Sequence, residues 1–377
     1  MSATSGRHRR VVVVSPRGTD PRSPALSPHL EFEDLIVAMD DAELVAPRHR
    51  RLGPRLEAVH NRVAKATRHA DRPPIAYRRV SPEAPSWDLL FALFLGPDDV
   101  LSVEAVDRWR ERSGVAIAWV IEAWRNELDM WKAHWEVLSR FDHVFVTMEP
   151  CVVPVQDLTG RPTYYLPYAT DALLFAPTDP GGPPRSIDVL SIGRRCEATH
   201  QHLLREARAG RLFYQFDSIR ASWVKDHAEH RFMYASLAQR TRFFVANRSL
   251  IGSEDKTGGQ EEFGGRFFDA AAAGAIPVGV FPRTARFREA FDWPDVGVEI
   301  DVDADPTACL LELLEHPEEL DRRAHRSIVE SLERHDWLHR WETILEVAGL
   351  DPTPAMERRR ECLAARRSRF AATFDDA

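Results

Sequence analysis

Residues 258–282 combine glycines and acids in a pattern that suits an anionic ligand. The segment reads GGQEEFGGRFFDAAAAGAIPVGVFP. Gly264 and Gly265 have no Cβ, so their backbone N–H groups can approach a ligand closely. They stand where a helix over residues 266–273 should begin, and a helix N-terminus favours phosphate oxygens. We therefore expect these two glycines to bind phosphate.

Two carboxylates flank this glycine turn. Glu261 precedes the expected helix and Asp269 lies inside it, eight positions later. If the whole span were helical it would cover about 12 Å, the scale that separates the hydroxyl-bearing ends of a nucleotide sugar. We predict that Glu261 holds the transferred sugar and Asp269 the ribose. A Gly-rich turn leading into a packed Ala helix explains the Ala-Ala-Ala-Gly part equally well, but it does not require the acids.

A second candidate phosphate ligand follows an apolar strand expected at residues 187–192. The strand runs directly into Gly193, Arg194 and Arg195, and α/β sheets place ligand-binding groups at such strand ends. Fixed cations stabilise the charge on a departing diphosphate. We predict this role for Arg194, with a solvated surface arginine as the alternative.

Other charged residues have more than one interpretation. Lys256, in the loop before the glycine motif, could supply further positive charge. Arg266, one residue into the expected helix, could contact phosphate or form an ion pair with Glu262. Glu122 follows a predicted strand and is either a helix-capping acid or, in an inverting enzyme, a general base. Ser15, Arg17 and Gly18 form the first strand–helix loop and would face the cleft of a two-domain enzyme.

Strands and helices alternate through both halves of the chain, which predicts an α/β protein with parallel sheets of Rossmann type. A Pro- and Gly-rich cluster at residues 177–184 marks the expected junction. We predict an acceptor-side domain at 1–165, a linker at 166–184, a nucleotide-sugar-binding domain at 185–335 and terminal helices at 336–377 that could pack back on the first domain. The strands are expected at residues 11–14, 42–46, 89–95, 115–121, 143–148, 187–192, 212–216, 241–246, 276–281 and 296–302.

Length, net charge and the distribution of apolar residues exclude some classes of protein. The length of 377 residues favours two domains, and the net charge of −8 argues against a general affinity for nucleic acid or anionic membrane. No apolar run approaches the roughly 20 residues of a transmembrane segment. An arginine cluster near the C-terminus (Arg358–Arg360, Arg366, Arg367 and Arg369) is interpreted as a solvated helix face.

Neither the cysteines nor the acids suggest a bound metal. The four cysteines have no CxxC spacing, so we expect isolated thiols in a reducing compartment, the cytoplasm. Asp301-Val302-Asp303 follows a late strand and is interpreted as a turn, not as a metal–diphosphate motif. We therefore expect metal-independent chemistry without a cofactor.

Three segments, taken in order, resemble the two-Rossmann-domain (GT-B) glycosyltransferases, and most closely their retaining Glu-x7-Glu branch, the glycosyl transferases group 1. YLPYATDALLFAP (165–177) is similar to the family linker, IDVLSIGRR (187–195) to the first donor-domain strand, and EEFGGRFFDAAAAGAIPV (261–278) to the family signature. The last segment also resembles a bacterial subgroup related to spore-maturation glycosyltransferases. Asp269 replaces the second family Glu, and RRCEATHQ lacks the family Lys, which Arg195 or Lys256 could replace.

The resemblance implies two Rossmann-like domains facing each other across a cleft, and a hexosyltransferase-like enzyme using a UDP-, GDP- or dTDP-sugar as co-substrate. The acceptor is unknown, and no nucleic acid partner is expected. It implies catalytic roles for Glu261, Arg194 and Lys256, and donor contacts by Gly193, Arg195, Glu262, Phe263, Gly264, Gly265, Arg266 and Asp269. The alternatives are a nucleotide-sugar epimerase or hydrolase on the same fold, and a non-catalytic nucleotide-sugar-binding module.

Overall fold

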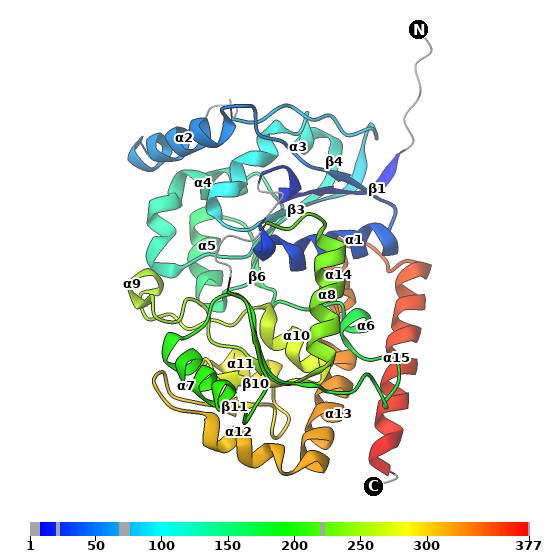
Figure 1. Cartoon of the computed structure of the whole chain (residues 1–377). Helices are drawn as coiled ribbons and strands as arrows, with labels where there is room; N and C mark the ends of the chain where they lie inside the picture. The colour runs from blue at the N-terminus through cyan, green and yellow to red at the C-terminus, as the bar shows by residue number, and fades with distance from the viewer. Residues whose placement is uncertain (1–7, 20–22, 68–75, 219–222, 376–377) are drawn as a thin grey trace. The chain divides into compact units, whose positions relative to one another are not determined.

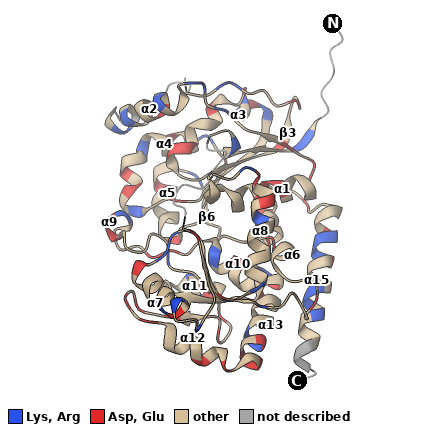
Figure 2. Cartoon of the chain, in the orientation of Figure 1, with Lys and Arg blue, Asp and Glu red and all other residues tan. Residues whose placement is uncertain are grey.

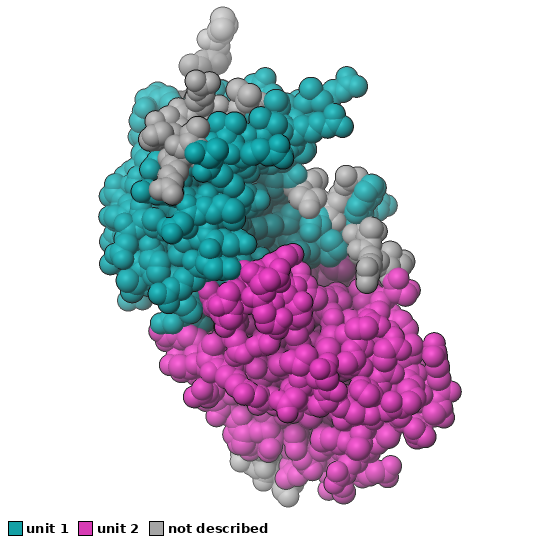
Figure 3. Space-filling view, turned by 90° about the vertical axis from the view of Figure 1, so that its left-hand side faces the viewer, with its two compact units in different colours: residues 1–167, 223–225, 340–357 teal, residues 168–222, 226–339, 358–377 magenta. Residues whose placement is uncertain are grey.

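The computed structural model of the chain describes residues 8–19, 23–67, 76–218 and 223–375. The chain divides into two units (Figure 3), one comprising residues 1–167, 223–225 and 340–357, and the other residues 168–222, 226–339 and 358–377. The chain therefore returns to the first unit after most of the second is complete. Each unit is built around its own parallel sheet.

In the first unit, the described residues form a six-stranded sheet in the order β2-β1-β3-β4-β5-β6 (Figure 1). Every neighbouring pair is parallel. The valines of β1 and the apolar run of β3 are almost completely buried, as expected for strands with both faces covered. The strands are β1 (Arg9–Val14), β2 (Ala42–Val45), β3 (Trp87–Phe94), β4 (Ser113–Val120), β5 (His143–Val146) and β6 (Thr163–Tyr165).

Helices and 3₁₀ turns connect these strands. The sequence predicts one helix over residues 124–140, whereas the structure has a 3₁₀ segment, η4 (Arg125–Trp131), followed by α4 (Lys132–Leu138). The indole N–H of Trp135 donates to the Leu128 carbonyl at 3.0 Å, so a side chain uses an oxygen that a continuous α-helix would bond internally. The other connections are η1 (Pro16–Gly18), η2 (Pro24–Leu26), α1 (Ser27–Met39), α2 (Gly53–Thr67), η3 (Pro97–Ala105), α3 (Trp109–Arg112), η5 (Glu149–Cys151) and α5 (Val152–Thr159). A later helix, α14 (Trp337–Ala348), belongs to this unit from residue 340 on and connects none of its strands.

In the second unit, the described residues form a five-stranded parallel sheet in the order β11-β10-β9-β7-β8. From β7 the chain crosses to β8 on one side, and from β9 it crosses to β10 on the other. The neighbours β7 and β9 therefore flank a topological switch point, where open α/β sheets bind ligands at the carboxyl ends of their strands. The strands are β7 (Ile187–Ser191), β8 (Tyr214–Phe216), β9 (Thr241–Val245), β10 (Ile276–Gly279) and β11 (Val298–Glu299).

Close helix packing in this unit depends on small residues in α10 (Gly265–Ala273). Its four alanines are fully buried. Gly274, which ends the helix at φ +68°, lies so close to α13 (Pro317–Arg334) that a Cβ would stand 2.7 Å from the Ile328 side chain. The remaining helices are α6 (Ala172–Phe175), α7 (Glu197–Arg208), α8 (His227–Gln239), α9 (Glu254–Thr257), α11 (Ala285–Ala290), α12 (Thr307–Leu314) and α15 (Pro354–Asp375), the last of which belongs to this unit from residue 358 on.

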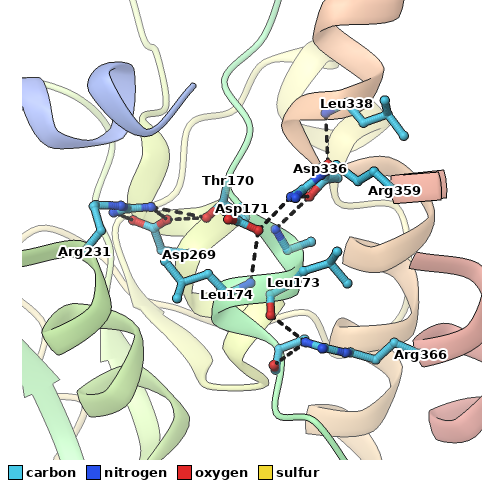
Figure 4. A network of polar contacts seen from close by, with 12 residues as sticks. Thr170, Asp171, Leu173, Leu174, Arg231, Asp269, Asp336, Leu338, Arg359 and Arg366 are labelled. Carbon is cyan, nitrogen blue, oxygen red and sulfur yellow. Dashed lines mark hydrogen bonds and ion pairs between the residues drawn. The ribbon is translucent and has the colours of Figure 1, made fainter. Parts of the chain in front are cut away.

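The terminal arginines are more than a solvated face. Blue segments mark the arginines along α15 in Figure 2, and Figure 4 shows two of these arginines bound within the second unit. Arg359 pairs with Asp171 and with Asp336, each at 2.7 Å, and Arg366 donates to the Leu173 and Ala176 carbonyls. The prediction of a solvated face is therefore wrong for these two side chains. They tie α15 to the segment that leads into α6.

The fold class predicted from alternation is confirmed, since both units contain parallel sheets with intervening helices. Each predicted strand has a counterpart in the structure, and only the short edge strand β6 lacked one in the prediction. Within the described residues, no helix combines the length and the apolar character that crossing a bilayer requires.

Candidate functional site

The loops that follow β7 and β9 of the second unit carry most of the predicted site residues. The β7–α7 loop carries Gly193, Arg194 and Arg195, and the β9–α10 loop ends at the first turn of α10. Leu190 of β7 pairs with Phe244 of β9. Gly193 and Asn247 each lie three residues beyond this pair, in the loops just past the ends of the two strands.

Gly193 and Arg266 join these two loops. Gly193 has φ +80°, and a Cβ there would stand 3.0 Å from the Arg266 guanidinium. The same guanidinium donates through Nη1 to the Arg194 carbonyl at 2.5 Å. Glycine is required here both for the left-handed backbone and for the approach of the arginine. The contact brings the first turn of α10 against the end of β7.

Two cations meet at this point. Burial lowers the pKa of Arg266, and the neighbouring charge of Arg194 lowers it further. The Arg194 side chain is exposed, and it forms no hydrogen bond or ion pair with the described residues. Like charges this close are unfavourable unless an anion lies near them. The arrangement is therefore suited to an anionic ligand.

Arg195 has a different environment from Arg194. Its Nη1 donates to the Asp217 carbonyl at 2.9 Å, and its guanidinium lies 5.5 Å from the centre of the Phe216 ring. The Asp217 carboxylate also accepts the Gly193 N–H at 3.1 Å. Arg195 and Asp217 thus secure the β7–α7 loop to the end of β8.

The N-terminus of α10 is open. Gly264, the N-cap, is extended at φ −114° and contributes no side-chain cap. The first N–H groups of a helix have no partner within it, so those of Gly265 and Arg266 can bind an acceptor. A buried aromatic cluster holds this turn in place, and it consists of Phe263, Phe267, Phe268, Phe281, Phe287, Phe291 and Trp293. Because the Phe263 ring belongs to this core, a donor contact by that residue would come from its backbone.

Glu261 is held by the loop that follows β10. Its Oε2 accepts the Arg283 backbone N–H at 2.7 Å, and its Oε1 pairs with Arg248. Arg248 also pairs with Glu254 at 3.1 Å. These bonds fix a half-buried carboxylate beside the first turn of α10.

Glu262 and Lys256, which also lie between β9 and α10, have different environments from Glu261. Glu262 is buried and accepts a hydrogen bond from the Gln260 amide at 2.7 Å. Lys256 is exposed on the short helix α9. Its predicted catalytic role stays a prediction.

Asp269 lies inside the protein, with its side chain 3% exposed. Arg231 of α8 donates Nη2 to its Oδ1 at 2.8 Å and Nη1 to its Oδ2 at 3.1 Å, and the Thr170 hydroxyl donates to Oδ1 at 2.8 Å (Figure 4). The helical span assumed between the two acids is absent, because α10 begins only at Gly265. The ribose contact of Asp269 stays a prediction. Its contacts in the structure give it a second role, the attachment of α10 to α8.

Sequence reasoning missed Arg231 and Asn247. Arg231 lies at helical spacing with the buried Tyr234, Ala235 and Ala238 of α8, so a charged residue on an apolar face was the signal. Asn247 is a polar residue just beyond the buried β9 strand, where ligand groups gather. Both positions could have been selected from pattern alone.

The loop after β1, which carries Ser15, Arg17 and Gly18, contacts other residues of the first unit. The Ser15 hydroxyl donates to Glu33 Oε2 at 2.6 Å, and Arg17 donates to the same oxygen at 3.0 Å. Glu33 is fully buried, and this burial raises its pKa to about 7, although both partners oppose the shift. Gly18 allows close packing on Pro47, whose carbonyl oxygen would stand 2.0 Å from a Cβ. Glu122 is exposed beyond β4.

Comparison with known proteins agrees with this architecture. Residues 194–346 match a family model described as "Glycosyl transferase-like". An alpha-glucosyltransferase solved with UDP-glucose and DNA containing an abasic site is 10% identical, over 91% of this chain and 100% of that chain, with a TM-score of 0.52. HepE from Anabaena, solved with UDP-glucose, is 13% identical over 91% of this chain and 100% of that chain, with a TM-score of 0.51. None of the curated proteins compared with the chain matches it.

These comparisons define a class. At such low identity the two structural likenesses show the fold alone, two Rossmann-like domains of the GT-B type. The chain therefore has the GT-B fold and carries a glycosyltransferase-like domain over residues 194–346. Membership of the retaining Glu-x7-Glu branch and of the spore-maturation subgroup stays a prediction.

Proposed function

We propose that the protein is a glycosyltransferase that moves a hexosyl group from a UDP-sugar to an acceptor, with the donor bound in the second unit. The observation that carries this proposal is the meeting of Arg194, Arg266 and the open N-terminus of α10 at the β7–β9 switch point. Two arginines and a helix N-terminus lie at the carboxyl ends of these strands, and their positive potential suits a diphosphate.

The chemistry follows from this placement. Transfer breaks the bond between sugar C1 and the diphosphate, and negative charge develops on the departing phosphate. Fixed positive groups stabilise that charge more in the transition state than in the ground state. Arg194 can reach the ligand because it is exposed and has no partner among the described residues. Arg266 holds the first turn of α10 against the β7–α7 loop.

Glu261 is proposed to bind the hydroxyls of the transferred sugar. Its two oxygens are oriented by the Arg283 N–H and Arg248, and each still has a lone pair to accept a hydroxyl. The two structural neighbours were solved with UDP-glucose, which supports a UDP-hexose among the possible donors. We further propose metal-independent transfer, since arginines and the helix dipole supply the positive charge. Retention of the anomeric configuration is proposed on the resemblance of residues 261–278 to the Glu-x7-Glu signature.

A reducing compartment, the cytoplasm, is proposed for the reaction. None of the four cysteines (Cys151, Cys196, Cys309 and Cys362), all of which lie within the described residues, forms a disulfide. Oxidising compartments favour disulfides, so four cysteines without a disulfide support this location. Non-reducing gel analysis of protein from gently lysed cells would reveal any disulfide.

The test is a turnover assay with UDP-, GDP- and dTDP-glucose over a panel of sugar and alcohol acceptors, with and without EDTA. The proposal expects release of UDP together with a glycosylated product, at a rate that EDTA leaves unchanged. An isomerised donor would identify an epimerase, and release of free sugar at the same rate without acceptor a hydrolase. Tight UDP binding without turnover on any acceptor would identify a binding module.

A further inference from the structure

We propose that Asn247 is a further donor-binding residue, whose side-chain N–H2 group donates to the diphosphate of the nucleotide sugar. The inference rests on the proposed function and adds a residue that the sequence motif does not contain. It starts from one buried amide and the contacts that fix its orientation.

The carboxamide is held in one orientation from its oxygen side. Oδ1 accepts the Val280 backbone N–H at 2.8 Å, so the nitrogen must face the other way. Gly279 makes room for this arrangement, because a Cβ there would stand 2.5 Å from Oδ1 and 2.1 Å from the Ala246 carbonyl oxygen. Its φ of +158° is likewise open to glycine and strained for other residues.

The nitrogen itself is buried and unpaired. Asn247 is only 8% exposed, and its Nδ2 has no hydrogen-bond partner among the described residues. A buried amide N–H without an acceptor costs free energy, and such groups in folded proteins are usually completed by a water or a ligand. The protein therefore presents a fixed, unused hydrogen-bond donor.

The position of Asn247 indicates the class of ligand that its N–H2 group binds. Asn247 and Gly193 each lie three residues beyond the paired Phe244 and Leu190, in the loops that follow β9 and β7 at the switch point. Two residues later, Ser249 donates its N–H to the Glu262 carbonyl at 2.7 Å, which holds this loop against the approach to α10. An N–H2 group needs an acceptor, and the nearby Arg194, Arg266 and helix N-terminus favour an anionic one. A diphosphate oxygen meets both conditions.

Asn247→Asp separates ligand binding from a purely structural role. Aspartate keeps an oxygen for the Val280 N–H but replaces the donor with a negative charge that repels phosphate. We expect the variant to fold, and to bind UDP and UDP-glucose at least 30-fold more weakly by calorimetry at pH 8. Asn126→Asp, an exposed position in η4, adds the same charge and should leave both affinities unchanged. Equal affinity of Asn247→Asp and wild type would overturn the inference.

A second measurement needs no folded variant at position 247. The chain has three asparagines, Asn61, Asn126 and Asn247, so selective ¹⁵N-asparagine labelling gives three side-chain amide signals. Asn61→Asp and Asn126→Asp assign two of them, and the third belongs to Asn247. UDP should shift that third signal at saturation. A wild type that binds UDP without this shift would overturn the inference alone, whereas a wild type that binds no nucleoside diphosphate would overturn the proposed function as well.

Discussion

Arg231 and Asp269 form a buried two-bond ion pair in the second unit, with side chains only 4% and 3% exposed. The Thr170 hydroxyl completes the contact, and the Arg231 guanidinium also lies 4.5 Å from the centre of the Phe175 ring. The pair joins α8 to α10, the helix whose first turn carries the proposed phosphate site. Asp269 thus helps to fix the helix that carries the proposed phosphate site.

Asp269→Asn should destabilise the protein by about 3–5 kcal/mol, because it leaves the Arg231 charge buried without its partner. Urea unfolding followed by circular dichroism measures the loss. Glu289→Gln breaks the exposed Arg286–Glu289 pair and should cost at most about 0.5 kcal/mol. Comparable losses for the two variants would show that the buried pair contributes little.

Gly193→Ala should weaken UDP binding more than it weakens the fold. Both Gly193 (φ +80°) and Gly210 (φ +72°) have left-handed backbones, but only at Gly193 would a Cβ meet another group, the Arg266 guanidinium. Each alanine should cost about 1–2 kcal/mol of stability from backbone strain. Calorimetry with UDP should show a loss of affinity for Gly193→Ala only. The same affinity in both variants would mean that the Gly193–Arg266 contact does not shape the site.

Arg194→Gln should lower kcat/KM by about 10²–10³-fold, the range for removal of one group that stabilises developing negative charge. Its melting temperature should stay within one degree or so of wild type, since surface substitutions away from structural contacts have small effects. Arg208→Gln, at an exposed position of α7 in the same unit, is the matched control and should keep full activity. Normal turnover by Arg194→Gln would remove this residue from the mechanism.

Glu33 should make stability depend on pH. Burial raises its pKa from 4.5 to about 7 in the folded protein, so the folded state binds a proton that the unfolded state has released. The favourable contribution is complete below pH 4.5 and is lost as pH rises through 7, by at most about 3 kcal/mol. Glu33→Gln, which can still accept from Ser15, should reduce this slope in urea unfolding between pH 5 and 7.5, and should be more stable than wild type at pH 8. An unchanged slope would show that the Glu33 carboxyl does not titrate in this range.

Local pattern was sufficient for much of the fold. The valines of β1, the run Leu89–Phe94 and the alanines of α10 are apolar over lengths that suit buried strands and a packed helix, and the structure has these elements. Edge strand β6 was not predicted because its three residues, Thr163–Tyr165, are too few to show an alternating pattern. The solvated arginine face failed because Arg359 and Arg366 bind groups nearly 200 positions earlier in the chain.

The sequence by itself determined the alternation of strands and helices, and the glycine turn with its acids before an alanine-rich helix, because these depend on neighbouring residues. Only the tertiary structure decided which acid faces where. Asp269 turns toward Arg231 and Thr170, which come from other elements, while Glu261 meets the backbone beyond β10. It also brought the loops that carry Asn247 and Gly193 to neighbouring strand ends through the pairing of β7 with β9. Such contacts join residues far apart in the chain, and no local periodicity encodes them.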